Sequence, residues 1–150
     1  MNEVSFYHLQ SEPLARALPR LLEKVTERGF RVLVRGQTEE QLEQLDDALW
    51  SYRADSFLPH AVAGEGVDPA AQPVLLTRET EGNANGAAVL VLIEHAPAAD
   101  LAAFDRCLYL FDGEDEASLT AARTRWRELK DSDIPVSYYQ QTEAGWKKMA

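Results

Sequence analysis

Three cations and one tryptophan share a short stretch of the sequence. Arg123, Arg127 and Lys130 stand at positions i, i+4 and i+7, and Trp126 lies between the first two. Residues three or four apart lie on one face of an α-helix, so these four side chains would be neighbours. Cations beside an aromatic ring can bind a carboxylate and an apolar side chain together. The pattern therefore predicts a site for a short acidic peptide or a chain-terminal carboxylate.

A purely structural interpretation of this stretch stays open. Trp126 and Leu129 can pack inward while the cations are solvated and complement the dipole at the end of the helix. The surrounding charge favours binding, because residues 120–150 carry 6 basic and 4 acidic side chains on a chain of net charge −10. The last fifth of the sequence is thus a basic end on an acidic protein.

A second group of aromatic residues occupies the stretch ALWSYRADSFLPH. Trp50 and Tyr52 come at the end of a predicted helix, and Phe57 follows in a predicted loop. Aromatic anchors contribute much of the binding energy at protein interfaces. Trp50 and Phe57 therefore form a second candidate surface for a protein partner. Alternatively, Trp50 continues the apolar stripe of its helix and covers the edge of the sheet.

The sequence offers little for catalysis. The first strand-to-helix turn reads HLQSEPL, without glycine, and GEGVDP is a lone Gly-x-Gly with no lysine behind it, so a phosphate-binding loop is not indicated. His8, His60 and His95 lack the spacing of paired metal ligands. His60 follows a loop, where a hydrogen-bonded structural histidine is favoured over a catalytic one. We expect no enzymatic activity, no cofactor and no bound metal.

Charge and hydropathy limit which partners and which cellular location we expect for the protein. A net charge of −10 repels a polyanion at long range, so DNA would be contacted only indirectly. The N-terminus has no charged leader followed by an apolar run, and the longest apolar stretch, Ala87 to Ile93, is too short to cross a bilayer. We expect a cytoplasmic protein that does not bind membranes.

Strands and helices alternate along most of the chain. Gly, Pro and Asp are frequent in residues 54–71, which indicates an irregular connection around a short extended piece at Phe57 and Leu58. Expected strands cover residues 4–9, 30–34, 74–77, 88–94, 107–111 and 135–139; expected helices run from Ser11 to Gly29, from Thr38 to Trp50, over a short stretch at 98–104 and over 116–130.

This alternation predicts an α/β fold of a single domain over residues 1–150. Nearly continuous apolar strands are typical of a parallel sheet buried on both faces. We therefore expect a three-layer, Rossmann-like domain with a largely parallel twisted sheet and helices on both faces. Open sheets of this kind often bind ligands in a crevice at the carboxyl ends of the strands. A small-molecule or nucleotide-binding domain is accordingly the alternative function.

The chain resembles a known family over nearly its whole length. The resemblance lies in FYHL, ERGFRVLV, QLDDALWSYRADSFLPH, QPVLLT, NGAAVLVLI, RCLYLFDG, RTRWRELKDSDIPVSYYQQ and GWKK, in this order. Together they are similar to the chi subunits of bacterial DNA polymerase III. The resemblance implies a Rossmann-like, non-catalytic accessory subunit of the clamp-loader assembly. Such a subunit holds the acidic C-terminal tail of the single-stranded-DNA-binding protein, which ends in Pro-Phe, and links that protein to the replisome.

The resemblance also implies where the tail is held. The family's tail site matches Arg123, Trp126 and Arg127 in this sequence, and some members have tyrosine in place of the tryptophan. A family lysine one helical turn earlier has no basic counterpart, because Leu119 and Thr120 occupy that region. Lys130 or Lys147 would then supply part of the positive charge.

The family's other interface matches Trp50 and Phe57. In the family, a tryptophan and a phenylalanine at these places contact the small psi subunit or, alternatively, a repair helicase. The resemblance therefore implies a second protein partner on a surface separate from the tail site.

Overall fold

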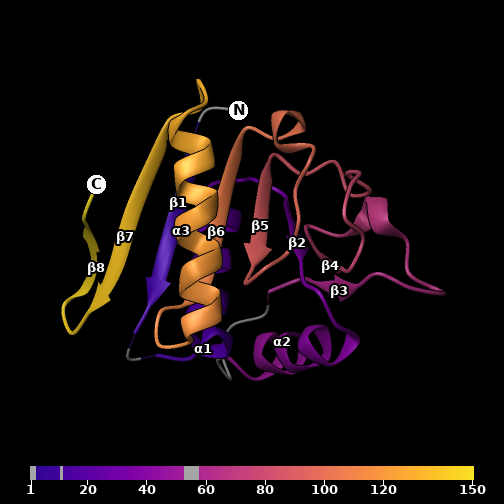
Figure 1. The fold of residues 1–150 in the computed structure, drawn as a ribbon. Coiled ribbons are helices and arrows are strands. Elements are labelled where there is room, and N and C mark those ends of the chain that lie inside the picture. Colours follow the sequence, from indigo (N-terminus) through magenta and orange to yellow (C-terminus); the bar gives the residue numbers. More distant parts are fainter. Residues whose placement is uncertain (1–2, 11, 53–57) are drawn as a thin grey trace.

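The computed structural model describes residues 3–10, 12–52 and 58–150, and these form one sheet with helices on both faces (Figure 1). The strand order is β3-β4-β2-β5-β6-β1-β7-β8, and every neighbouring pair is parallel except β7 with β8. The strands are β1 (Glu3–Leu9), β2 (Val32–Arg35), β3 (Ala61–Val62), β4 (Val74–Thr77), β5 (Val89–Ile93), β6 (Arg106–Asp112), β7 (Val136–Thr142) and β8 (Gly145–Lys148).

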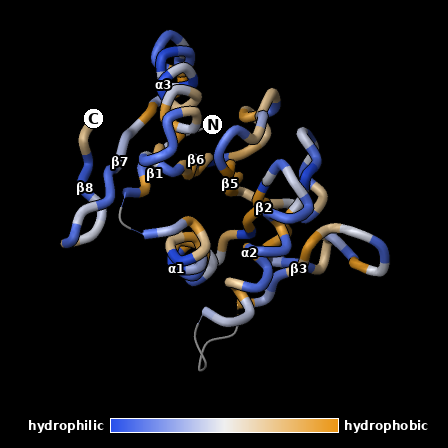
Figure 2. The backbone as a smooth tube through the Cα atoms, turned by 60° about the horizontal axis from the view of Figure 1, so that its bottom comes forward, coloured by the Kyte–Doolittle hydropathy of each residue, from blue (hydrophilic) through white to orange (hydrophobic). Residues whose placement is uncertain are grey.

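Among the residues that the structure describes, three helices cover the sheet. They are α1 (Leu14–Glu27), α2 (Glu39–Ser51) and α3 (Glu116–Lys130), with single 3₁₀ turns η1 (Pro69–Ala71) and η2 (Leu101–Ala103). Figure 2 shows α3 on one side of the sheet and α1 and α2 on the other. The fold is therefore the predicted three-layer, Rossmann-like α/β arrangement. In the described part of the chain, none of the helices is both long and apolar enough to span a membrane.

Alternation along the strands produces two separate hydrophobic cores. In β5, Val91 packs in the core under α1 and α2, whereas its neighbours Leu90 and Leu92 pack in the core on the α3 side. Successive side chains of a strand point to opposite faces, so each central strand must be apolar throughout. The same rule sends Phe6 of β1 to the α3 side and Tyr7 to the α1 side.

The helix ends follow local sequence signals. Thr38 caps α2 by accepting a hydrogen bond from the backbone N–H of Gln41, as predicted, and Asp115 caps α3 by accepting one from the N–H of Ser118. Helix α1 starts after Pro13, and Pro19 lies inside it. Gly29 follows α1 with a φ of 87°, a left-handed conformation that glycine adopts at little cost.

Several predictions about the elements need correction. The helix expected over 98–104 is only the turn η2, because Asp100 before it turns outward to pair with Arg35 and Phe104 after it is buried in the core. The last strand does not stop at Tyr139 but continues to Thr142 and turns back as β8.

The helix expected from Ser11 begins at Leu14, with Pro13 at its N-cap position. The strand expected from Phe30 begins at Val32, and Phe30 is exposed. Phe57, like Ser11, lies outside the described residues, so the structure does not address the extended piece at Phe57.

Candidate functional site

An aromatic cluster lies between α3 and strands β1, β6 and β7, with Tyr138 at its centre. The Tyr138 ring meets the Trp126 ring edge to face, with centroids 5.6 Å apart and planes at 90°. Trp126 also contacts Phe6 edge to face at 5.3 Å, and Phe6 stacks on Tyr138 at 6.3 Å. Edge-to-face and offset contacts each add roughly 0.5–1.5 kcal/mol beyond the burial of area. These contacts hold Trp126 on the sheet while part of it remains accessible to solvent.

The predicted cations border this cluster. Lys130 Nζ lies 5.2 Å from the centre of the Trp126 ring, in a cation–π contact. Arg123 and Arg127 are exposed, and neither forms an ion pair within the described residues. Leu129 packs in the core, as the structural interpretation required. The helix thus uses Leu129 and part of Trp126 for packing and presents three cations beside the remaining tryptophan surface.

His8 and Tyr138 form a hydrogen-bonded pair beneath α3. Nδ1 of His8 lies 2.6 Å from Oη of Tyr138. Burial lowers the pKa of His8, and the positive charge of Arg123 lowers it further, whereas Asp112 acts in the opposite direction. Burial also raises the pKa of Tyr138, and Arg123 opposes that rise. The guanidinium of Arg123 is therefore close enough to act electrostatically on both members of the pair.

Strand register places Lys147 on the same side of the sheet as this cluster. Lys147 of β8 pairs with Gln140 of β7, and paired residues point to the same face. Gln140 is two residues from Tyr138, so Tyr138, Gln140 and Lys147 share the α3 side. Lys147 is exposed and lies one strand beyond the cluster. It adds positive charge to that side, as the sequence suggested.

The second candidate surface contains an exposed tryptophan. Trp50 is 57% exposed at the end of α2, so the structure contradicts the alternative of a core tryptophan that covers the sheet edge. Its ring contacts the imidazole of His60, with centroids 4.8 Å apart. Nδ1 of His60 donates a 2.7 Å hydrogen bond to the Leu58 carbonyl, and Nε2 lies 3.0 Å from a carboxylate oxygen of Asp46. His60 is a buried structural residue that packs against Trp50. Phe57 lies outside the described residues.

The alternative function, binding of a small molecule or nucleotide, requires a crevice at the carboxyl ends of the strands. At the ends of β1 and β6 this space is filled by the protein itself. The N–H of Gly113 donates to the Leu9 carbonyl at 2.7 Å, and a Cβ on Gly113 would lie 1.7 Å from Nε2 of His8. Asp112, Glu114 and Asp115 surround this turn, and their charge would repel a phosphate. The local chemistry is therefore unsuited to a nucleotide.

The carboxyl end of β2 is also occupied. The Arg35 guanidinium is buried, binds both carboxylate oxygens of Asp100 at 2.7 and 2.9 Å, and donates to the Gly82 carbonyl at 2.8 Å. The hydrogen bonds that Asp100 accepts from Arg35, together with one from the backbone N–H of Gly82 at 3.0 Å, lower the pKa of Asp100 to about 2. A nearby cavity of about 280 Å³ is lined by Glu79 and Glu81. Arg35 thus fixes two loops to the sheet, and the cavity beside it carries negative charge.

Sequence reasoning missed three residues of the site. Phe6, His8 and Tyr138 were recognised as parts of strands but not as the floor beneath Trp126. Their alternation is visible in the sequence, but the pairing of β1 with β7 joins residues about 130 positions apart. No local pattern reveals that pairing. Within the described residues, no group of three or more His, Cys, Asp or Glu side chains is arranged to hold a metal ion.

Comparisons with known proteins place the chain in a family. The family model described as "DNA polymerase III chi subunit, HolC" matches residues 1–137. DNA polymerase III subunit chi of Pseudomonas aeruginosa is 33% identical over 139 residues, which cover 91% of this chain and 94% of that protein. DNA polymerase III subunit chi of Escherichia coli K12 is 28% identical over 154 residues, covering 98% of this chain and 100% of that protein.

A further relative is matched over a shorter length. A probable DNA polymerase III subunit chi of Rickettsia prowazekii is 35% identical over 103 residues, which cover 67% of this chain and 60% of that protein. These matches and the fold agree with one another, and the chain belongs to the DNA polymerase III chi subunit family. Its role accordingly lies in DNA replication.

Proposed function

We propose that this chain is a non-catalytic adaptor that binds the acidic C-terminal tail of the single-stranded-DNA-binding protein. The tail would bind along the edge of α3 that carries Arg123, Trp126, Arg127 and Lys130. In this role the protein connects the single-stranded-DNA-binding protein to the clamp-loader assembly of DNA polymerase III. DNA itself would be reached only through that partner.

One observation carries the proposal: unpaired arginines border a partly exposed tryptophan that the fold holds rigidly. Guanidinium groups form strong, charge-assisted hydrogen bonds with carboxylates. Trp126 is fixed by edge-to-face contacts with Phe6 and Tyr138, so little conformational entropy is lost when an apolar side chain packs on it. An acidic segment that ends in phenylalanine supplies carboxylates for the arginines and an apolar ring for the surface of Trp126.

The proposed affinity follows from the size of the site. Two or three charge-assisted contacts and the burial of one phenylalanine correspond to a dissociation constant around micromolar. This equals a binding free energy on the order of −8 kcal/mol. Because part of this free energy comes from exposed charges, added salt should weaken binding.

A second surface supports a second partner. Trp50 is 57% exposed on α2, which lies on the opposite side of the sheet from α3 (Figure 2). We assign Trp50 and Phe57 to the interface with the psi subunit of the clamp-loader assembly or with a repair helicase. Two partners could then bind at once, as an adaptor of the cytoplasmic replication machinery requires.

The test is a titration of the protein with a peptide of about nine residues that matches the tail of the single-stranded-DNA-binding protein. Arg123→Ala and Trp126→Ala should each reduce the affinity at least about tenfold. The first removes a cation that would bind a carboxylate, and the second removes the aromatic surface that would contact the phenylalanine. Circular dichroism would check that both variants remain folded.

Arg16→Ala is the matched control, since Arg16 is an exposed cation of α1 on the opposite side of the sheet. It removes the same net charge and should leave the affinity unchanged. Equal binding by the wild type and both α3 variants would contradict the assignment of the site. An equal loss in the Arg16 variant would show that only the overall charge matters.

A further inference from the structure

His8 is a buried titratable group with one ring nitrogen that the surrounding packing leaves unsatisfied. It is about nine-tenths buried, on β1 beneath α3, yet its Nε2 atom has no hydrogen-bond partner among the described residues. An unsatisfied buried polar atom destabilises the fold relative to an apolar replacement that fills the same space. A residue retained at that cost would need a compensating role.

Among the described residues, the hydrogen bond of the His8 imidazole goes to the centre of the aromatic cluster. Nδ1 lies 2.6 Å from Oη of Tyr138, and Tyr138 in turn holds Trp126 edge to face. The imidazole also packs on Phe111, with ring centroids 5.1 Å apart. Gly113 closes the other side, because any Cβ there would overlap the imidazole. His8 is thus confined in one place, from which it fixes the Tyr138 hydroxyl.

Charged and titratable groups face His8 from three elements. Arg123 acts on it from α3, Asp112 from β6 and Tyr138 from β7. Arg123 is also one of the two arginines assigned to the tail. The imidazole therefore acts on the site in two ways: its hydrogen bond positions Tyr138, and its charge interacts with that of Arg123.

We propose that His8 is a positioning residue of the tail site, which holds Tyr138 against Trp126 and whose protonation strengthens binding of an acidic peptide. This inference rests on the proposed function of the α3 surface. It adds a residue on β1 that the resemblance did not indicate, and it couples the affinity of the site to pH.

The direction of the pH dependence follows from linkage. In the free protein, burial and then Arg123 hold the pKa of His8 below its ordinary value, so protonation is resisted. Carboxylates of a bound peptide would neutralise Arg123 and raise that pKa. The complex would then take up a proton more readily, and affinity would increase as pH falls through the pKa that His8 has in the complex.

The decisive variant is His8→Asn. An asparagine side-chain amide can reach the position of Nδ1 and keep a hydrogen bond to Tyr138, but it does not titrate. Wild type should bind the acidic, phenylalanine-ended peptide on the order of threefold more tightly at about pH 5.5 than at about pH 7.5. The His8→Asn variant should match wild type at the higher pH and show no gain at the lower pH.

Two further variants separate positioning from titration. His8→Leu removes the hydrogen bond as well as the charge and should bind more weakly at both pH values, and Tyr138→Phe should reproduce the weaker binding while leaving the ring in place. His95→Asn is the matched control, because His95 is exposed and makes no contact with Tyr138 among the interactions found. It should keep the pH dependence of wild type.

The outcomes distinguish this inference from the proposed function. A pH gain that persists in His8→Asn, or full affinity in both His8→Leu and Tyr138→Phe, would overturn the role of His8 while the tail site stands. Absence of peptide binding by wild type at both pH values would overturn the proposed function and this inference with it. Independently of any peptide, His8→Leu should weaken the near-ultraviolet circular dichroism of Trp126, judged against a Trp126→Phe reference.

Discussion

The two sides of the β1–β7 pair carry similar residues but differ in charge balance. On the α3 side, Phe6 and Tyr138 lie beneath Trp126 and its neighbouring cations. On the α1 side, the alternate residues Tyr7 and Tyr139 stack at 5.3 Å, and Trp146 of β8 meets Tyr7 edge to face at 5.1 Å. Each side thus carries clustered aromatic rings and cations from the helix that covers it.

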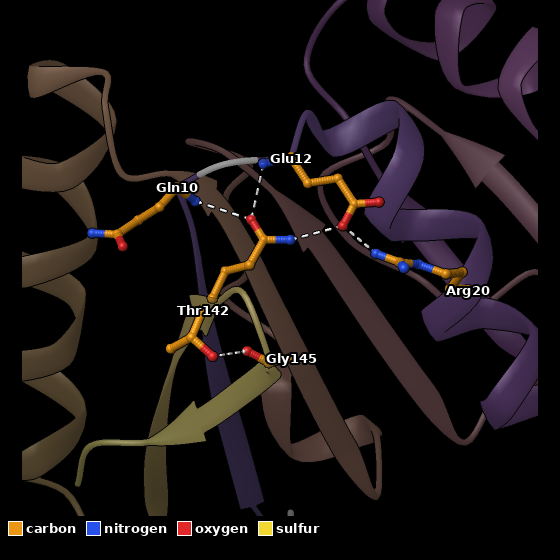
Figure 3. A network of polar contacts seen from close by, with 6 residues as sticks. Gln10, Glu12, Arg20, Thr142 and Gly145 are labelled. Atoms are coloured by element: carbon orange, nitrogen blue, oxygen red, sulfur yellow. Dashed lines mark hydrogen bonds and ion pairs between the residues drawn. The ribbon is translucent and has the colours of Figure 1, made fainter.

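The α1 side has the more obvious cavity. A hollow of about 450 Å³ lies between α1 and the β7–β8 hairpin, lined among others by Arg20, Lys24 and Trp146. Two carboxylates, Glu12 and Glu143, line the same hollow. Figure 3 shows Glu12 paired with Arg20. The side-chain amide of the nearby Gln141, which is 7% exposed, also donates to Glu12 at 2.8 Å.

The difference shows that a cavity and a set of residue types do not by themselves make a site for an acidic peptide. In the α1 hollow, two cations face two carboxylates, and one cation is already paired. On the α3 side, Arg123 and Arg127 have no acidic partner among the described residues. Uncompensated charge, rather than depth, favours the α3 surface.

The largest effect is expected from reversing charge on the α3 side. Arg123→Glu combined with Arg127→Glu should weaken tail binding more than about 100-fold, because attraction becomes repulsion. Both positions are exposed and glutamate is a good helix former, so the variant should stay folded. Loss of the positive charge of Arg127 from the last turn of α3 should cost no more than about 1 kcal/mol through the helix dipole. Isothermal titration calorimetry measures the affinity, and thermal unfolding checks the fold.

The control for this reversal is Arg16→Glu combined with Lys24→Glu on α1. These cations are also exposed, and the change in net charge is the same. The control should bind the tail within about threefold of wild type, since long-range repulsion between exposed charges is screened at physiological salt. A loss as large as that of the α3 variant would remove the distinction between the two sides.

An intermediate effect is expected from removing the two negative charges that line the α1 hollow. Wild type should bind one tail peptide per chain. Glu12→Gln combined with Glu143→Gln keeps the shapes of the side chains but leaves Arg20 and Lys24 uncompensated, so a second, weaker binding event should appear. Its affinity should lie roughly tenfold or more below that of the α3 site. Binding of two peptides by wild type would show that charge balance does not separate the two sides.

The smallest effect on the tail is expected from Trp50→Ala. Trp50 is largely exposed and lies on α2, so its removal should change tail affinity less than about twofold and stability by less than about 0.5 kcal/mol. Binding of the second partner, psi or a helicase, should instead be lost. A pull-down with that partner and a peptide titration on the same preparation would measure both.

The sequence predicted much of the sheet and the helical face that carries the outer residues of the proposed site. Apolar runs such as 74–77 coincide with strand β4, and the helix over 116–130 coincides with α3, because strand and helix periodicities are local signals. Arg123, Trp126 and Arg127 were found for the same reason, since i+3 and i+4 spacing fixes a helical face.

The inner part of the site was beyond local reasoning. His8 and Tyr138 meet only through the pairing of β1 with β7, which joins the two ends of the chain. Trp50 was equally ambiguous, because an apolar stripe does not show whether its last residue is covered. The antiparallel strand β8 was missed for a different reason: its polar sequence GWKK has no apolar run to mark it.

The central claim is that uncompensated cations and Trp126 together bind an acidic tail ending in phenylalanine. The most direct measurement is calorimetric titration of the wild-type protein with the tail peptide, and with the same peptide lacking the terminal phenylalanine, at low and high salt. The account predicts one site with a dissociation constant around micromolar, weakened by salt and lost without the phenylalanine. Binding that ignores the phenylalanine, or no binding at millimolar peptide, would contradict it.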